Sequence, residues 1–167
     1  LRGKPGRFVC LTVHAMDELR IERASAGRPE DALRLIEEYY DAVDVRERDC
    51  REALLGYLSD SRSGIWIAYV GSSPAGCILF RPLEGRKAGE IKRLYVRPAY
   101  RRRGLAAQLL VALEQFAREQ GLSCLYLDSK DDLHDAIAFY RRNGYTPCPR
   151  YNDNRQATIF MRKPIAP

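Results

Sequence analysis

The 167-residue chain has little of what metal, disulfide or membrane proteins require. Its five cysteines are odd in number, lie far apart and form no C-x-x-C pair. This pattern argues against a zinc site and a disulfide framework, and it favours reduced thiols in a cytoplasm. The only histidines, His14 and His134, belong to no H-E-x-x-H motif, and no apolar run approaches the roughly 18 residues that a membrane span needs. We therefore expect a cytoplasmic protein that holds no metal and has no membrane partner.

Two familiar phosphate-binding loops are also missing. A dinucleotide fingerprint needs three glycines spaced G-x-G-x-x-G, whereas Gly104 stands alone. The G-x-x-x-x-G-K-[ST] string of a P-loop does not occur in the chain. The stretch from Gly71 to Gly76 misses the G-x-S-x-G pattern by one position, and it predicts a hairpin turn instead. Nucleotide-binding folds of these two kinds and a serine-hydrolase elbow are thereby excluded.

The composition is that of one ordinary globular domain. Hydrophobic residues make up 46% and charged residues 30% of the chain, which is long enough to bury a full core. The net charge of +6 suits nucleic acid or an anionic cofactor, and charge alone does not choose between them. Residues 1–15 are basic and Met16 resembles a natural start, so we expect an N-terminal extension over 1–15 and one domain over 16–167. An edge strand at Phe8–Thr12 is the alternative.

Hydrophobic periodicity predicts the element order β-α-α-β-β-β-α-β-α-β-β. Alternating or β-branched runs predict strands at Leu19–Arg23, Ile65–Val70, Ala75–Phe80, Glu90–Val96, Ser123–Asp128, Tyr145–Pro147 and Ala157–Met161. Helical spacing predicts helices that start near Pro29 and over Val45–Leu58, Gly104–Gln120 and Leu133–Arg142. This order is that of a mixed α/β fold.

The most informative stretch runs from Glu90 to Leu109 and reads EIKRLYVRPAYRRRGLAAQL. A strand ends at Arg97-Pro98, three arginines follow, and Gly104 opens an apolar-periodic helix. The first turn of such a helix has unpaired N–H groups and partial positive charge, and glycine lets a ligand approach the backbone closely. A phosphate or pyrophosphate is the expected ligand. A basic turn that only caps the helix is the alternative.

Arg101, Gly104 and Ala106 form R-x-x-G-x-A directly after this strand. The combination resembles the acetyl-CoA signature Q/R-x-x-G-x-G/A of the GNAT N-acetyltransferase superfamily, and the resemblance covers about residues 17–163. It implies an α/β fold with a mixed, mostly antiparallel central sheet flanked by helices, and acetyl-CoA as co-substrate. It also implies that the strand end and the basic turn hold the cofactor through Leu94, Tyr95, Val96, Arg101, Arg102, Arg103, Gly104, Leu105, Ala106 and Ala107.

The segment AIAFYRRNGY, which ends at Tyr145, resembles the family's A-x-x-F/L-Y-x-x-x-G-F/Y pattern. In the family this tyrosine, here Tyr140, sits beside the CoA sulfur, which implies a general acid. A phenol of pKa about 10 protonates a thiolate of pKa about 8.5 at a cost of only ~2 kcal/mol. The alternative is a core residue on the apolar stripe of its helix. Leu133 occupies the position where the family often has asparagine, and Asp135 and Asn143 are the candidate substitutes.

Glu90 is the candidate base, because the family often has an acid near the acceptor amine at the start of this strand. Proton transfer from an ammonium of pKa about 10.4 to a carboxylate of pKa about 4.3 is uphill by about 8 kcal/mol. Burial must therefore raise the pKa of Glu90, or Glu90 must pass the proton on through water, or Glu90 only attracts an amine that is already deprotonated. Strand alternation places Glu90, Lys92, Leu94 and Val96 on one face. A solvated glutamate paired with Lys92 or Arg93 is the alternative.

In related acetyltransferases the loop before the last strand borders the acceptor, so Tyr151 and Asn152 are candidate substrate contacts. The resemblance thus implies direct attack of a primary amine on acetyl-CoA in one ternary complex, with a backbone N–H near Leu94–Val96 stabilising the oxyanion. A CoA-binding regulatory module without turnover is the first alternative. A nucleic-acid-binding domain built on the three arginines is a weaker one. Small amines, amino acids, antibiotics and protein N-termini all stay open as acceptors, and so does a homodimer.

Overall fold

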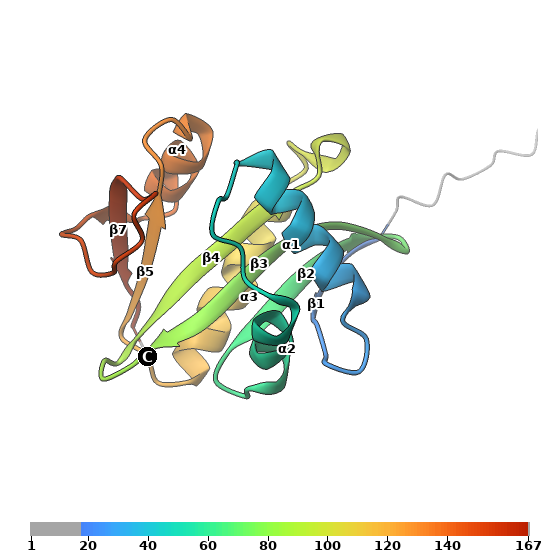
Figure 1. Ribbon diagram of the computed structural model, residues 1–167, viewed down its shortest axis with the longest axis horizontal. Helices are drawn as coiled ribbons and strands as arrows, with labels where there is room; N and C mark the ends of the chain where they lie inside the picture. Colours follow the sequence, from blue (N-terminus) through green and yellow to red (C-terminus); the bar gives the residue numbers. More distant parts are fainter. Residues whose placement is uncertain (1–17, 167) are drawn as a thin grey trace, which may run out of the picture.

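The computed structural model describes residues 18–166, so the expected extension over 1–15 and its alternative strand lie outside the described part. The predicted element order is confirmed (Figure 1). The strands are β1 (Leu19–Arg23), β2 (Gly64–Val70), β3 (Ser73–Leu83), β4 (Ala88–Val96), β5 (Cys124–Ser129), β6 (Thr146–Pro147) and β7 (Ile159–Pro164). The helices are α1 (Glu30–Ala42), α2 (Arg51–Ser59), α3 (Leu105–Glu119) and α4 (His134–Arg142), with a 3₁₀ turn at Pro98–Tyr100.

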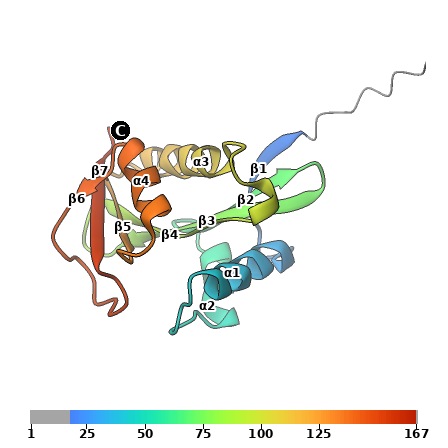
Figure 2. The same ribbon diagram turned by 90° about the horizontal axis from the view of Figure 1, so that it is seen from above.

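The seven strands form one sheet in the order β1-β2-β3-β4-β5-β7-β6, and β4 and β5 make the parallel pair among otherwise antiparallel neighbours. Helices α1 and α2 cover one face, and α3 and α4 lie on the other (Figure 2). Each face has its own core, because each helix buries one apolar stripe against the sheet. The fold is therefore the expected mixed α/β architecture with a mostly antiparallel sheet.

The helix predicted over Val45–Leu58 begins later than expected, at Arg51. The preceding loop makes contacts that a helix would prevent. The Tyr40 hydroxyl donates to the Asp49 carboxylate at 2.6 Å, and the Asp49 amide donates to the same hydroxyl at 3.2 Å. The prediction over residues 45–50 was wrong because these contacts with α1 hold the chain in a non-helical path.

Strand β4 contains a bulge at Arg93. Cys77 and Leu79 of β3 lie two residues apart, yet they pair with Tyr95 and Lys92, which lie three residues apart. One extra residue is therefore inserted in β4. Arg93 takes a φ of 57°, in the left-handed region that side chains other than glycine rarely adopt.

The bulge reverses the alternation that follows it. Leu94 and Val96 pack with Ile91 against the core under α3, whereas Lys92 stays on the α1 side, opposite Leu79. The prediction that Glu90, Lys92, Leu94 and Val96 share one face was wrong, because one inserted residue exchanges the two faces of the strand beyond it.

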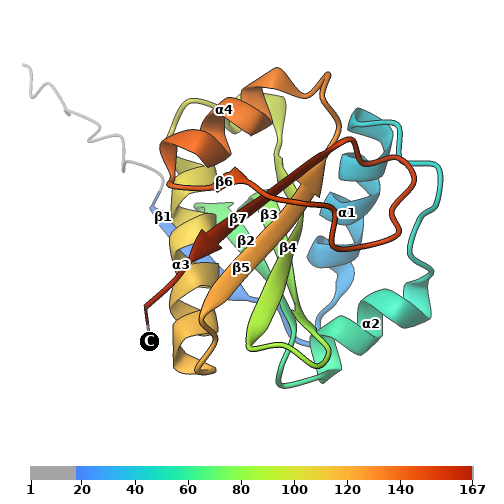
Figure 3. The same cartoon turned by 90° about the vertical axis from the view of Figure 1, so that its left-hand side faces the viewer.

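Strands β4 and β5 lie side by side only at their first halves. Their pairing runs from Ala88–Cys124 to Ile91–Leu127 and then ends. Figures 1 and 3 show that helix α4, which follows β5 in the chain, lies at the carboxyl ends of the two strands. Between Lys92 and Val96 the backbone groups of β4 that point away from β3 consequently have no strand partner on the β5 side.

Candidate active site

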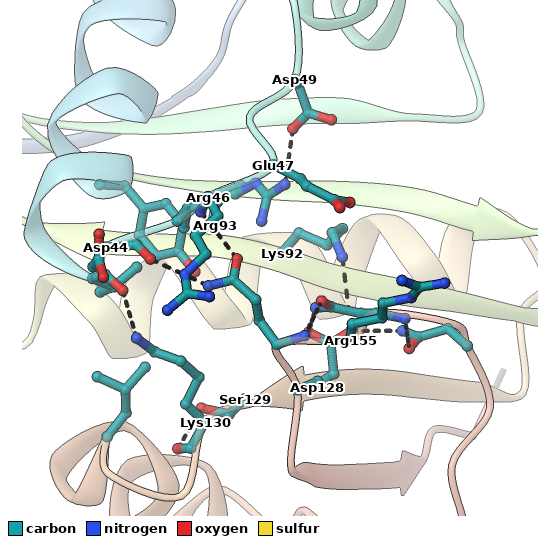
Figure 4. A pocket seen from close by; sticks show the side chains of 18 of the residues that line it. Asp44, Arg46, Glu47, Asp49, Lys92, Arg93, Asp128, Ser129, Lys130 and Arg155 are labelled. Carbon is teal, nitrogen blue, oxygen red and sulfur yellow. Dashed lines mark hydrogen bonds and ion pairs between the residues drawn. The ribbon is translucent and has the colours of Figure 1, made fainter.

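Two clefts open beside the β4 bulge and meet there. The first, which we call the strand cleft, has a volume of about 610 Å³ and lies between β4 and α4. The second, the loop cleft, has a volume of about 580 Å³ and lies between the α1–α2 loop and the β6–β7 loop (Figure 4). The residues that line both clefts form their junction: Tyr39, Val43, Lys92, Arg93, Asp128, Ser129 and Leu133.

The strand cleft follows the unpaired edge of β4 toward the start of α3. Gly104 precedes α3 with a φ of 78°, and a Cβ added there would meet no atom within 4 Å. Arg101 donates to the Val96 carbonyl at 3.0 Å, which fixes the basic turn to the end of β4. Unpaired strand N–H groups followed by a helix N-terminus provide donors for an extended polar chain that ends in an anion.

The predicted cofactor residues divide into two groups. The strand cleft is lined by Leu94, Tyr95, Val96, Arg101 and Ala106. The other five residues lie at the end of this cleft, in the basic turn and in the first turn of α3: Arg102, Arg103, Gly104, Leu105 and Ala107. Of these, Leu105 is buried in the core.

Tyr140 lines the strand cleft on α4 and is 7% exposed. Its ring packs edge-to-face against Phe139 and Tyr145, so it is also part of the core, and the two interpretations of its position do not exclude each other. Burial raises the pKa of its hydroxyl well above the usual range, and the Tyr39 and Asp128 side chains add to the rise. Tyr140 therefore keeps its proton at neutral pH.

Leu133 lies at the start of α4 and lines both clefts. Of the two candidates for the missing asparagine, Asp135 lines the strand cleft. Asn143 lies at the other end of α4, where its amide donates to the Phe139 carbonyl at 2.8 Å.

Glu90 has no exposed surface and is absent from the lining of both clefts. Its carboxylate accepts hydrogen bonds from Arg81 at 2.6 Å and from Tyr151 and Asn152 at 2.9 Å each. Burial alone would raise its pKa, but Lys92, Arg81 and Tyr151 outweigh burial and hold the pKa below the ordinary value of 4.5. Glu90 is thus a buried anion, and neither the solvated glutamate nor the base raised by burial describes it.

The two candidate acceptor contacts both bind Glu90. Tyr151 packs its ring against Tyr126 and Phe160 and does not line a cleft. Asn152 does line the loop cleft, and its amide nitrogen also donates to Asp128 at 2.6 Å. Asn152 therefore connects the buried Glu90 carboxylate to the Asp128 carboxylate at the junction of the two clefts.

Sequence reasoning missed Asp128. It lies near the carboxyl end of β5, its side chain is 12% exposed, and it lines both clefts. Asn154 donates to its second oxygen at 3.2 Å. The usable signal was an acidic residue at the end of a strand parallel to β4, because ligands bind beyond the carboxyl ends of parallel strands.

The walls of the loop cleft are joined by hydrogen bonds. Gln156 accepts from the Arg46 amide at 3.0 Å and donates to the Asp44 carbonyl at 3.3 Å. Lys130 donates to the Val43 carbonyl at 2.7 Å (Figure 4). The cleft is thus assembled from segments that are more than 80 residues apart in sequence.

Within residues 18–166 no group of three or more His, Cys, Asp or Glu is placed to hold a metal ion, and no helix there is long and apolar enough to cross a membrane.

This fold and the cleft beside β4 define a class of protein. The family model described as "Acetyltransferase (GNAT) family" matches residues 29–145, so the chain belongs to that family. It is similar to an uncharacterized N-acetyltransferase of Schizosaccharomyces pombe, with 34% identity over 88 residues, 52% of this chain and 54% of that protein. The chain spans about half the length of the first curated relatives it matches.

Two solved structures share the fold. A GNAT-family acetyltransferase from Staphylococcus aureus superposes with a TM-score of 0.75 at 18% identity, over 88% of this chain and 99% of that one. The PaiA N-acetyltransferase from Thermoplasma acidophilum, solved in complex with coenzyme A, gives a TM-score of 0.68 at 16% identity, over 89% and 99% of the two chains. At these identities the likeness shows the fold alone.

Proposed function

We propose that the chain transfers an acetyl group from acetyl-CoA to a primary amine, by direct attack of the amine within one ternary complex. The observation that carries the proposal is the meeting of the two clefts at the β4 bulge. One cleft has the strand edge and helix N-terminus that suit CoA, and the other opens toward a separate acceptor. Family membership and the coenzyme A complex of the Thermoplasma protein support the same assignment.

In this proposal, backbone N–H groups of Leu94–Val96 bind the pantetheine, and residues Arg102–Ala107 hold the pyrophosphate. The residues present fit such a ligand, since the edge of β4 is unpaired and the turn at Gly104 is open. Arg101, Arg102 and Arg103 add positive charge beside the helix N-terminus. Acetyl-CoA supplies an acetyl group activated as a thioester.

The residues at the junction act on the proton and the charge. Asp128 attracts the amine of the acceptor and holds its lone pair toward the strand cleft. An N–H of the β4 edge near Leu94–Val96 stabilises the developing oxyanion. Tyr140 donates its proton to the leaving thiolate. Glu90 acts as a positioning residue, because its lowered pKa and three donors keep it ionised beneath Asn152.

A direct assay of thiol release tests the proposed acetyl transfer. Purified protein, acetyl-CoA and a panel of primary amines are mixed, and release of free thiol is followed. Thiol release with at least one amine supports acetyl transfer. Tight CoA binding without thiol release for any amine would instead favour a regulatory module, and DNA binding that weakens steeply with salt would favour the nucleic-acid alternative. A cytoplasmic location remains part of the proposal, in line with the free thiols of Cys50, Cys77, Cys124 and Cys148.

A further inference from the structure

A cation and an anion lie side by side at the junction of the two clefts. The Lys92 Nζ is 3.9 Å from the Asp128 Oδ2, and each side chain is 12% exposed. Both residues line both clefts, so a ligand in either cleft reaches both charges.

Within residues 18–166 the Lys92 ammonium has two ion-pair partners but makes no hydrogen bond of ordinary length to either. Its nearest carboxylate oxygens are 3.6 Å away on Glu90 and 3.9 Å away on Asp128, both beyond ordinary hydrogen-bond length. An ammonium carries three donors, and Lys92 lines both clefts, so these donors are accessible to a ligand. Glu90 already accepts hydrogen bonds from Arg81, Tyr151 and Asn152. An acceptor atom supplied by a ligand would therefore satisfy Lys92.

Asp128 has the complementary capacity. Each of its oxygens accepts one amide hydrogen bond, from Asn152 at 2.6 Å and from Asn154 at 3.2 Å. An ionised carboxylate has about four acceptor sites, so two of them stay available for an amine. The two asparagines also fix the carboxylate in place.

The ion pairs beside the β4 bulge are balanced in charge. Arg81, Lys92 and Arg93 are matched by Glu90, Asp128 and Asp49 through ion pairs. A simple ammonium or a simple carboxylate would bring one uncompensated charge into this partly buried site, which is unfavourable. A ligand that carries one charge of each sign keeps the balance.

We propose that the acceptor is an α-amino acid, which carries an amine and a carboxylate on the same carbon. Its amine binds Asp128 and its carboxylate binds Lys92. A short spacer between the amine and the carboxylate suits two protein charges 3.9 Å apart. The inference rests on the proposed acetyl transfer and names the substrate class of the same site.

The reaction balances as follows. The ammonium first loses one proton to solvent beside Asp128. The amine nitrogen then forms a bond to the acetyl carbon, and the carbon–sulfur bond breaks. The sulfur takes a proton from Tyr140, the second amine proton leaves to solvent by the same route as the first, and one proton from solvent restores the Tyr140 hydroxyl. The products are an N-acetyl amino acid, free CoA and one proton, and the carboxylate on Lys92 is unchanged.

The test compares matched acceptors. For each of a set of α-amino acids, kcat/KM is measured for the acid and for its carboxamide and is expressed per free amine, because the carboxamide lacks the negative charge and its amine also has a lower pKa. The acid should exceed the amide by about 10- to 100-fold in the wild-type protein, as expected for a hydrogen bond to a charged group. Lys92→Met should reduce this ratio to near one, because activity on the acids should fall more than activity on the amides. Lys87→Met, at an exposed lysine on the turn before β4, should keep the ratio.

Two outcomes would overturn the inference: equal activity on acids and amides in the wild-type protein, or an equal loss on both in Lys92→Met, as a structural lysine would give. If no amine releases thiol, the proposed function fails, and calorimetry still tests the site. With the CoA-saturated protein, tighter binding of the acids than of the amides would support the charge pair as a dipolar-ligand site. Equal binding would reject it.

Discussion

Arg93, at the β4 bulge, is ion-paired with Asp49, in the loop before α2, at 3.0 Å. Tyr40 donates to the same carboxylate at 2.6 Å, and the guanidinium lies over the rings of Tyr39 and Tyr40. Arg93, which has an unfavourable positive φ, is thus held by contacts with α1 and with the loop before α2. The pair couples the α1–α2 loop, one wall of the loop cleft, to the strand that the proposed cofactor follows.

Asp49→Asn should destabilise the protein, because Arg93 is largely buried and would lose its counter-charge. We expect a loss of about 2 kcal/mol in unfolding free energy, or several degrees in Tm. Thermal unfolding measures this loss. Asp41→Asn is the matched control, since the Asp41 carboxylate pairs with Arg48 at 2.8 Å but its side chain is 70% exposed, and it should cost no more than about 0.5 kcal/mol. Equal costs for the two variants would contradict this account of the bulge.

Gly104→Val should abolish binding of acetyl-CoA while the protein stays folded. The φ of 78° at this position is strained for a β-branched residue, and the side chain would project into the open space that the pyrophosphate needs. Titration by calorimetry measures the affinity. Gly85→Val is the control, because Gly85 has a similar φ of 72° and open surroundings in the β3–β4 turn. Unchanged affinity in Gly104→Val would place the cofactor elsewhere.

Tyr140→Phe should lower kcat by roughly 10²- to 10⁴-fold and leave the affinity for acetyl-CoA near its wild-type value, because only the proton donor is removed. The unfolding temperature should barely move, since the ring and its packing remain. Tyr145→Phe is the comparison, because the Tyr145 hydroxyl donates to buried Glu114 at 3.0 Å and its loss should appear in stability instead of turnover. Normal kcat in Tyr140→Phe would mean that water protonates the thiolate and that Tyr140 serves the core alone.

The unfolding temperature should fall as the pH is lowered from 5 toward 3. The pKa of Glu90 is lower in the folded protein than its ordinary value of 4.5, so its contribution is fully present above that value and is lost as the pH falls through the folded pKa. The pKa values of Glu38 and Asp49 are lowered too, and they act in the same direction. Glu90→Gln should flatten this acid limb in a series of melts, whereas Glu84→Gln, whose side chain is 80% exposed, should not. Parallel curves for Glu90→Gln and the wild type would refute the role of Glu90 in acid stability.

The features that the sequence predicted correctly are local ones. The order of strands and helices followed from apolar periodicity, and the basic turn at Gly104 followed from residues adjacent in the chain. The start of α2 and the faces of β4 were predicted wrongly. Both depend on distant residues: Tyr40 holds the loop before α2, and Asp49 holds the bulge at Arg93. Propensity in a short window does not contain such contacts.

The sequence by itself determined the fold class and the half of the site that we propose for CoA, because one strand, one turn and one helix N-terminus, continuous in the chain, make that half. Only the tertiary structure decided the half that we propose for the acceptor. Lys92 and Asp128 come from neighbouring parallel strands, and the asparagines that orient Asp128 come from a loop that returns across β5. The burial of Glu90 was likewise invisible in the sequence, since its donors lie 9 to 62 residues away and meet only when the strands pair. Side-chain charges act over a few ångströms of space, whatever their separation along the chain.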